Sequence, residues 1–326
     1  LYKGEVLGNT NNYLKTFRLR MWIDEDSNQN DINGKSFTGM VNVYSNAKVL
    51  EDTTKYFKNV LLNKNTIIEA EPTLTTSSNN TSDASGLYKS TATNTGDPTY
   101  YFRGNIDNNY VSFAGQTWRI VRINEDGTIR IIMQDGINND ATYKFNSNYN
   151  SYAYMYYTNS EVKPVLESWY NDNIGNNNSY SKYVANGNYY CEQAKAKYGS
   201  SWTSGNASMS IYTNYTPNFK CTTDGNGYGL VNSSIGLLTY DEVVYAGGYY
   251  NKNNNLYYLQ NETNNWWTMS PTGLYQTYAV VWDVYQDGYI NGNRVYSEYI
   301  IRPVINIKSD TLVSGSGTST DPFIIN

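Results

Sequence analysis

The stretch WDVYQDGYINGNRVYSEY, from Trp282 to Tyr299, concentrates the side chains of this chain that could do chemistry. Carboxylates, phenols, amides and one guanidinium follow one another, but the chain contains no histidine. Histidine is the commonest general base and zinc ligand, and every Ser-His or Cys-His nucleophile pair depends on it. We therefore predict that the chain is not an enzyme and that this stretch serves noncovalent recognition.

Small apolar residues alternate with large or polar ones over a wider strip, residues 272–299. The small apolar residues, expected to face inward and hold the scaffold, are Ala279, Val281, Val284, Ile290 and Val295. The residues between them are expected to point outward, because tyrosine, tryptophan, asparagine and arginine are typical of protein-binding surfaces. The predicted ligand contacts are Leu274, Tyr275, Gln276, Tyr278, Trp282, Asp283, Tyr285, Gln286, Asp287, Tyr289, Asn291, Asn293, Arg294, Tyr296, Glu298 and Tyr299.

The composition of the chain limits its partners. Its 326 residues carry a formal net charge of −5, which argues against nucleic acid and anionic membranes as partners. Charged residues make up only 16%, and there are 35 tyrosines, so solubility rests on uncharged polar groups. No apolar run approaches the roughly 20 residues of a membrane span. No cofactor is expected.

The two cysteines, Cys191 and Cys221, fit no metal-binding spacing. In a polar, tyrosine-rich chain they indicate an oxidising, extracellular setting and one disulfide, with two unpaired buried thiols as the alternative. The first residue is Leu1 rather than Met, so we expect a signal or anchor on a segment outside this chain. The predicted location is the cell surface.

Residues 1–72 are predicted to form a small, β-rich accessory domain. The segments KTFRLRMWID and GKSFTGMVNVYS alternate apolar and polar residues, as the strands of a small sandwich do. The turn between them carries alternating oxygen-bearing residues from Asp24 to Asn30, as a calcium loop does. However, Gln29 and Lys35 stand where such a loop needs Gly and Glu, so we favour a solvated turn without metal. The segment LEDTTKYFKNVLLNKN that follows suits a short helix, or a helix that leads into a last strand.

Residues 73–96 lack apolar periodicity and are predicted to be a linker or a wrapping arm. Residues 97–326 are predicted to form the second, ligand-binding domain. It starts with two strands, residues 118–123 and 128–133, which an EDG turn joins into a hairpin.

Two helices are predicted in the second domain. One follows Ser160, a favourable N-cap, and ends at Gly175. The other starts with a capping box formed by Thr239 and Glu242 and stops at Gly247. With short strands elsewhere, these helices predict an α+β domain with two helices against small antiparallel sheets.

Five segments carry a resemblance to a known family: YYFRGNIDNNYVSFAGQTWRIVRINEDGTIRII, GLLTYDEVVYAGG, WWTMSP, IRPVINIKSD and GSGTSTDPFII. In this order they resemble a domain of surface proteins of low-GC bacteria, similar to the formylglycine-generating-enzyme branch of the C-type lectin fold. The resemblance covers Gly86 to Asn326. The N-terminal part resembles the all-β, Ig-like accessory domain that such proteins carry next to a membrane or pilin-like anchor.

The resemblance implies a receptor-like scaffold with a C-type lectin-like C-terminal domain. Several relatives are variable proteins of diversity-generating retroelements, in which mutagenesis rewrites codons near the C-terminus. The matching segment is the strip, between WWTMSP and IRPVIN. The implied function is a cell-surface adhesin or receptor whose strip binds a protein or glycan on another cell, host or phage surface.

Three alternatives stay open beside this interpretation. An enzyme of the same fold would need a reactive cysteine pair near the C-terminus, but no cysteine follows Cys221, and Asp241 and Glu242 are explained by the capping box. A fixed-specificity glycan-binding adhesin would have to work without calcium, because the EPN, QPD and WND triplets are absent. A structural pilus or surface subunit would need a large apolar patch, whereas the strip is amphipathic.

Overall fold

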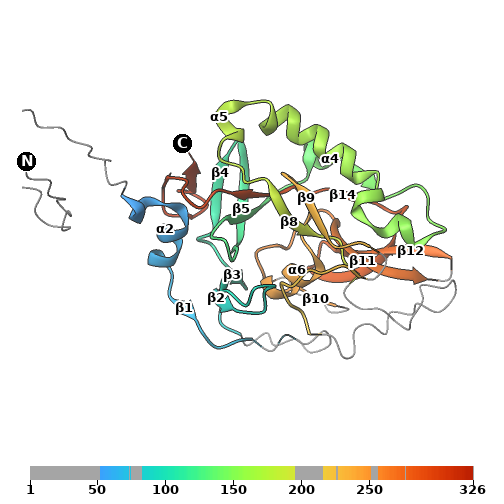
Figure 1. Ribbon diagram of the computed structural model, residues 1–326, viewed down its shortest axis with the longest axis horizontal. Coiled ribbons are helices and arrows are strands. Elements are labelled where there is room, and N and C mark those ends of the chain that lie inside the picture. The colour runs from blue at the N-terminus through green and yellow to red at the C-terminus, as the bar shows by residue number, and fades with distance from the viewer. Residues whose placement is uncertain are drawn as a thin grey trace, which may run out of the picture. The chain divides into compact units, whose positions relative to one another are not determined.

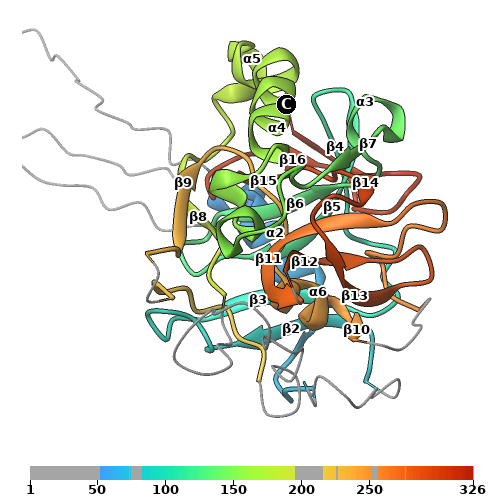
Figure 2. The ribbon, with the colours of Figure 1, turned by 90° about the vertical axis from the view of Figure 1, so that its right-hand side faces the viewer.

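The computed structural model describes residues 52–72, 74, 83–194, 216–224, 227–250, 256–275 and 277–325. The two N-terminal strands and the calcium loop considered at Asp24–Asn30 lie outside the described residues. Asp52–Asn326 form one compact unit, and Figures 1 and 2 show it from two sides.

The larger sheet is mixed, and within the described residues it contains nine strands. Its main path runs β1-β2-β3-β5-β4-β17-β16, and β6 pairs with both β5 and β15 off this path. The strands are β1 (Ile67–Ile68), β2 (Gly86–Ser90), β3 (Thr99–Arg103), β4 (Tyr110–Phe113), β5 (Gln116–Ile123), β6 (Ile129–Met133), β15 (Val304–Ile307), β16 (Val313–Ser314) and β17 (Phe323–Ile325). The expected hairpin of residues 118–133 is confirmed as β5 and β6, with Gly127 of the turn at φ 86°.

The second sheet has six described strands in the order β10-β13-β12-β11-β14-β7. They are β7 (Thr142–Lys144), β10 (Tyr249–Tyr250), β11 (Trp266–Tyr275), β12 (Tyr278–Val284), β13 (Tyr289–Arg294) and β14 (Glu298–Ile300). A separate ribbon pairs β8 (Gly187–Cys191) with β9 (Leu230–Ser233). Figure 1 shows β11 and β12 of the six-stranded sheet in orange on the right.

Both predicted helices are confirmed by their local signals. Helix α4 starts where the Ser160 hydroxyl accepts a hydrogen bond from the Lys163 amide, and a π-helical turn continues it to Gly175. Helix α6 starts with the Thr239–Glu242 capping box and stops at a glycine with φ 121°. The helical segments are η1 (Thr53–Lys55), α2 (Phe57–Lys64), α3 (Ile137–Asp140), η2 (Tyr152–Met155), η3 (Tyr157–Asn159), α4 (Val162–Tyr170), η4 (Asn171–Gly175), α5 (Asn178–Ser181) and α6 (Tyr240–Ala246).

The segment before Thr99 packs onto the strands that follow it. Phe57 of α2 is fully buried and contacts Phe323 of β17, with ring centroids 5.3 Å apart. Strand β1 pairs with β2, and β2 pairs with β3 over its whole length. Residues 52–72, which the sequence assigns to the accessory domain, and β2, which it assigns to the linker, thus contribute to the nine-stranded sheet and its core.

A buried arginine in the IRPVIN segment connects the two sheets. Arg302 is 1% exposed, and it donates hydrogen bonds to the carbonyls of Met133 at 3.0 Å and Leu259 at 2.7 Å. Its guanidinium carbon lies 4.9 Å from the ring centroid of Trp266 in β11. Arg302 therefore satisfies backbone groups at the junction and covers a core tryptophan. The fold is predominantly β with few helices, compatible with the expected α+β class.

Candidate ligand-binding surface

The strip forms the central part of the six-stranded sheet. It includes the end of β11, all of β12 and β13, and the start of β14. In the β12–β13 ladder, Trp282 pairs with Gly292 and Asp283 pairs with Asn291. Because successive side chains of a strand point to opposite faces, Trp282 and Asp283 lie on opposite sides of this sheet.

The inward-facing part of the strip was largely predicted from the sequence. All five small apolar residues expected to face inward are 0% exposed: Ala279, Val281, Val284, Ile290 and Val295. They support the neighbouring positions of the strip by packing into the hydrophobic core.

Three of the predicted contact residues are buried as well. Leu274 is 6% exposed, Trp282 3% and Asp283 0%. The ring of Trp282 packs on Tyr240 of α6, with centroids 4.5 Å apart. The expectation that these three side chains point outward is wrong, because β11, which holds Leu274, and β12, which holds the other two, are each buried on both faces over most of their length.

One end of the strip forms an aromatic platform, which consists of Tyr149, Tyr278, Arg294 and Tyr296. The ring centroid of Tyr149 lies 5.3 Å from that of Tyr278 and 5.2 Å from that of Tyr296. The guanidinium carbon of Arg294 lies 4.4 Å from the Tyr278 centroid, and its Nη1 donates to the Tyr296 hydroxyl at 2.8 Å. Stacking and this hydrogen bond hold the arginine before any ligand arrives.

The platform is anchored to the sheet through the backbone. The Tyr149 carbonyl accepts a hydrogen bond of 2.7 Å from the Ala279 amide of β12, and the Ala279 carbonyl accepts one of 3.1 Å from Val295. Tyr149 is nevertheless 42% exposed, and Arg294 is exposed. The platform thus combines a fixed backbone with accessible side chains.

A polar network surrounds the buried carboxyl of Asp283 on the other face. Asn293 Nδ2 lies 2.9 Å from Asp283 Oδ1 and 3.1 Å from the Tyr285 hydroxyl, to which Asn291 also donates at 3.3 Å. Asp283 Oδ2 has no hydrogen-bond partner among the described residues. Burial raises the pKa of the Asp283 carboxyl well above its usual range, against the opposing effect of the Asn293 hydrogen bond. Burial, Asp283 and Tyr285 also raise the pKa of the Tyr299 phenol.

The remaining predicted contacts differ in exposure. Tyr275 is 51% exposed, and Gln286 and Glu298 are exposed. Half-buried positions are Tyr278, Tyr285, Asp287, Tyr289, Asn291, Asn293, Tyr296 and Tyr299. Gln276 lies outside the described residues. The structure therefore brings Tyr278, Arg294 and Tyr296 together on the surface, and gathers Tyr285, Asn291, Asn293 and Tyr299 around Asp283.

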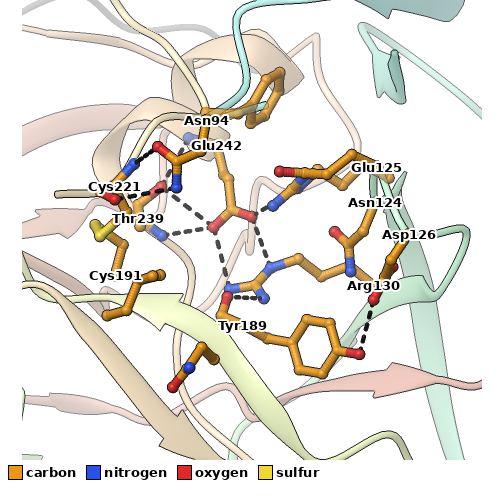
Figure 3. Close-up of a pocket in the computed structure, with 14 residues that line it drawn as sticks. Asn94, Asn124, Glu125, Asp126, Arg130, Tyr189, Cys191, Cys221, Thr239 and Glu242 are labelled. Atoms are coloured by element: carbon orange, nitrogen blue, oxygen red, sulfur yellow. Dashed lines mark hydrogen bonds and ion pairs between the residues drawn. A yellow bond between two sulfur atoms is a disulfide. The ribbon is translucent and has the colours of Figure 1, made fainter. Parts of the chain in front are cut away.

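A small cavity away from the strip contains a buried cluster of one carboxylate and two guanidinium groups. It has a volume of about 200 Å³, below the roughly 300 Å³ at which ligand pockets usually start. Figure 3 shows the Glu242 carboxylate between the Thr239 backbone and the guanidinium of Arg130. Glu242 Oε1 lies 2.6 Å from Arg130 Nε and 3.2 Å from Arg122 Nε, and Oε2 accepts from the Thr239 amide at 2.9 Å.

The electrostatics of Glu242 indicate a structural role. Burial opposes ionisation, but the attraction of Arg130 and Arg122 outweighs it and lowers the pKa of the carboxyl. A carboxylate that two arginines hold ionised is a poor general acid or base. Nearby, the Tyr189 hydroxyl donates a hydrogen bond of 2.8 Å to Asp126. Burial and this hydrogen bond raise the pKa of the Tyr189 phenol to about 12.

The expected disulfide between Cys191 and Cys221 is present at the edge of this cavity. The Asn94 side chain accepts a hydrogen bond of 2.8 Å from the Cys221 amide and donates one of 3.0 Å to its carbonyl (Figure 3). The disulfide and the two hydrogen bonds of the Asn94 side chain together hold residues 216–224 at the edge of the cavity.

No helix in the described ranges is long and apolar enough to span a membrane. Nor do these ranges contain a group of three or more His, Cys, Asp or Glu side chains placed to hold a metal ion.

Comparison with known families gives one match. Residues 126–309 match the family described as "Domain of unknown function (DUF6273)". The chain belongs to this family. No curated protein and no solved structure matches the chain.

The DUF6273 segment includes the strip and part of the Glu242 cavity. The whole strip, the disulfide, Arg130 and Glu242 lie within it, whereas Arg122 and strands β2 to β5 precede it. Since β5 pairs with β6 inside the segment, residues outside the DUF6273 match complete the sheet on which the family segment rests.

Sequence reasoning missed two components of these sites. Tyr149 joins the platform from a loop far from the strip in sequence, and the only available signal was the Tyr/Asn-rich composition of residues 143–158. The pairing of Glu242 with Arg122 and Arg130 had no local signal, because the capping box already accounted for the carboxylate.

Proposed function

We propose that this DUF6273 protein is an extracellular binding protein that recognises a protein ligand through the aromatic platform and the exposed residues next to it. The observation that carries the proposal is the convergence of three tyrosines and one arginine on an accessible, backbone-anchored part of the sheet. Such side chains supply large, rigid contact area at low entropic cost and dominate the energetics of protein interfaces.

The division of the strip into two layers supports this proposal. The inner layer consists of small apolar residues, Trp282 and Asp283, which are buried. The outer layer consists of Tyr275, Tyr278, Arg294, Tyr296 and Glu298, which reach the surface fully or in part. Outer positions of this kind can change without disturbing the core, as a diversified receptor requires.

The finer part of the proposal follows from the resemblance. We infer that the domain is a C-type lectin-like scaffold, that a diversity-generating retroelement rewrites the outer layer, and that an anchor outside this chain displays the protein on the cell surface. The disulfide supports an extracellular location, because such bonds persist in oxidising compartments.

A binding assay tests the platform directly. The chain is applied to an array of bacterial and phage surface proteins and to a glycan array, and compared with a double variant, Arg294→Ala with Tyr296→Ala. Leu312→Ala serves as the control, because Leu312 is 53% exposed and lies outside the strip.

The proposal expects a protein ligand whose Kd rises at least tenfold in the double variant and stays unchanged in the control. Binding to glycans alone, weakened in the double variant, would favour the calcium-free adhesin instead. If a protein ligand binds the double variant and the parent with equal affinity, the platform does not contribute to ligand binding.

A further inference from the structure

A second cavity, of about 380 Å³, opens between the turn at α3 and the end of α4. Both elements lie in the upper part of Figure 2. The volume is within the range of small-molecule sites, about 300–1,000 Å³. No predicted contact residue of the strip lines this cavity, so it is separate from the proposed ligand surface.

One wall of the cavity is a left-handed turn. Asn138, Asn139 and Asp140 have φ values of 53°, 57° and 61°. Asn and Asp enter this region more readily than other non-glycine residues, but usually as single residues, so three in succession are unusual. The Asp140 carboxylate holds the turn by accepting hydrogen bonds from the Gly136 amide at 2.6 Å and from Asn264 at 3.3 Å.

The opposite wall also departs from regular backbone. Asn173 lies in the π-helical turn η4, a rare conformation that often marks functional sites. Its Nδ2 donates to the Trp169 carbonyl at 2.8 Å, which leaves the side-chain carbonyl of Asn173 for another donor. Trp169 itself lines the cavity and is 7% exposed, held by Trp118 with ring centroids 6.5 Å apart.

Several polar groups of the lining have no partner in the described structure. The side chains of Gln116 and Asn139 form no hydrogen bond with any described residue. Gln116 is half-buried, whereas Asn139 and Asp135 are exposed and therefore accessible to a ligand. An amide both donates and accepts, and so does a hydroxyl group. The lining contains no lysine or arginine, which disfavours an anionic ligand.

We propose that this cavity binds a neutral pyranose sugar, free or at the end of a glycan. The amides of Gln116 and Asn139 hydrogen-bond its hydroxyls in both directions, Asp135 accepts from a further hydroxyl, and the exposed part of Trp169 contacts its apolar face. Asn139 comes from the left-handed turn, Gln116 from the start of β5 and Trp169 from α4, so separate elements supply these groups around one cavity.

The test is ligand-observed saturation-transfer NMR with the whole chain. The probes are glucose, galactose, mannose and N-acetylglucosamine, each also as its methyl glycoside, with glucuronate and choline as charged comparisons. Each probe is measured with EDTA and with added calcium. Binding of methyl glycosides indicates a glycan end as the source, whereas binding of free sugars alone indicates a free monosaccharide, and either supports the proposal.

Two variants locate the binding without stressing the fold. Asn139→Gly removes the amide while glycine accepts the left-handed backbone freely, and Gln116→Ala removes a side chain that forms no hydrogen bond with a described residue. Asn178→Ala is the matched control, since Asn178 is exposed on α5 and does not line the cavity.

The proposal predicts saturation transfer to at least one neutral sugar in EDTA, with Kd raised about tenfold in each cavity variant, the size expected for one lost hydrogen bond. The control keeps the parental Kd. Transfer to no neutral sugar, transfer that requires calcium, transfer to choline or glucuronate alone, or equal binding by the cavity variants each overturns it.

Discussion

The side-chain amide of Asn293 donates a hydrogen bond of 2.9 Å to the carboxyl of Asp283, which is 0% exposed. This contact joins two neighbouring strands of the strip and satisfies only one of the two carboxyl oxygens. A charge at this position is poorly compensated, because the cluster contributes amides and phenols but no cation. The strip thus contains a buried group whose ionisation opposes folding.

Replacement of Asp283 by Asn is predicted to stabilise the protein at neutral pH. Burial raises the pKa of this carboxyl, so the folded chain holds the proton more tightly than the unfolded chain. The Asp283 carboxyl therefore makes its whole contribution to the free energy of unfolding at pH values below its ordinary pKa. This contribution is lost as the pH rises through the raised pKa. Asp283→Asn should raise the free energy of unfolding by about 1 kcal/mol at pH 8, the size of a typical single substitution.

Urea unfolding of parent and variant between pH 3 and pH 8 measures this effect. The gain should grow with pH, while Asp310→Asn, at an exposed position, should change nothing. A gain that is independent of pH would contradict the account of Asp283.

Replacement of Glu242 by Gln is predicted to be strongly destabilising. Glu242 pairs with Arg130 and Arg122, whose side chains are 1% and 10% exposed. Removing one partner of a buried ion pair costs about 3–5 kcal/mol, because the other charge stays buried. Since the pKa of Glu242 is lowered by folding, its contribution is present above its ordinary pKa and is lost as the pH falls through the lowered one.

The control for this variant is Glu125→Gln. Glu125 pairs with Arg122 at 3.2 Å, but its side chain is 25% exposed, so the loss should stay below about 1 kcal/mol. Chemical denaturation measures both losses. If the two variants lose the same free energy of unfolding, burial does not determine how much each ion pair stabilises the protein.

Loss of the disulfide is predicted to lower stability without removing the fold. Cys191 and Cys221 are separated by 30 residues, for which the chain-entropy model gives about 3–4 kcal/mol. Thermal unfolding should shift downward when a reductant is added to the parent. The double variant Cys191→Ser with Cys221→Ser should melt at the lower temperature with or without reductant. If reductant lowers the melting temperature of the double variant as well, its effect on the parent does not come from the disulfide.

The sequence predicted elements whose signals are local. The capping box of Thr239 and Glu242, the stop at Gly247 and the hairpin of β5 and β6 all rest on residues within a few positions of one another, and all are present. The parallel pairing of β17 with β4 joins distant segments, and no local pattern announces it. The pairing of β1 with β2 has no local signal either, because β2 lies within residues 73–96, which the sequence predicted to be a linker.

Within the candidate site, alternation predicted the small apolar residues but misplaced Trp282 and Asp283. The prediction assumed that large or charged residues of a strand point to solvent. This assumption does not hold for a strand that is covered on both faces. Whether β12 is central or at an edge depends on the pairing of β11 and β13 around it, which is a tertiary property.

The most direct test of the central claim is to sequence the coding region in many cells of one isolate, together with the neighbouring DNA. If the outer layer of the strip binds ligands and is diversified, substitutions should gather at Tyr275, Tyr278, Arg294, Tyr296 and Glu298. The codons of Leu274, Trp282 and Asp283 should stay constant, because their side chains are buried. A reverse transcriptase gene and a template copy should lie nearby. A uniform strip without a template copy, or substitutions spread evenly over buried and exposed positions, would contradict the account.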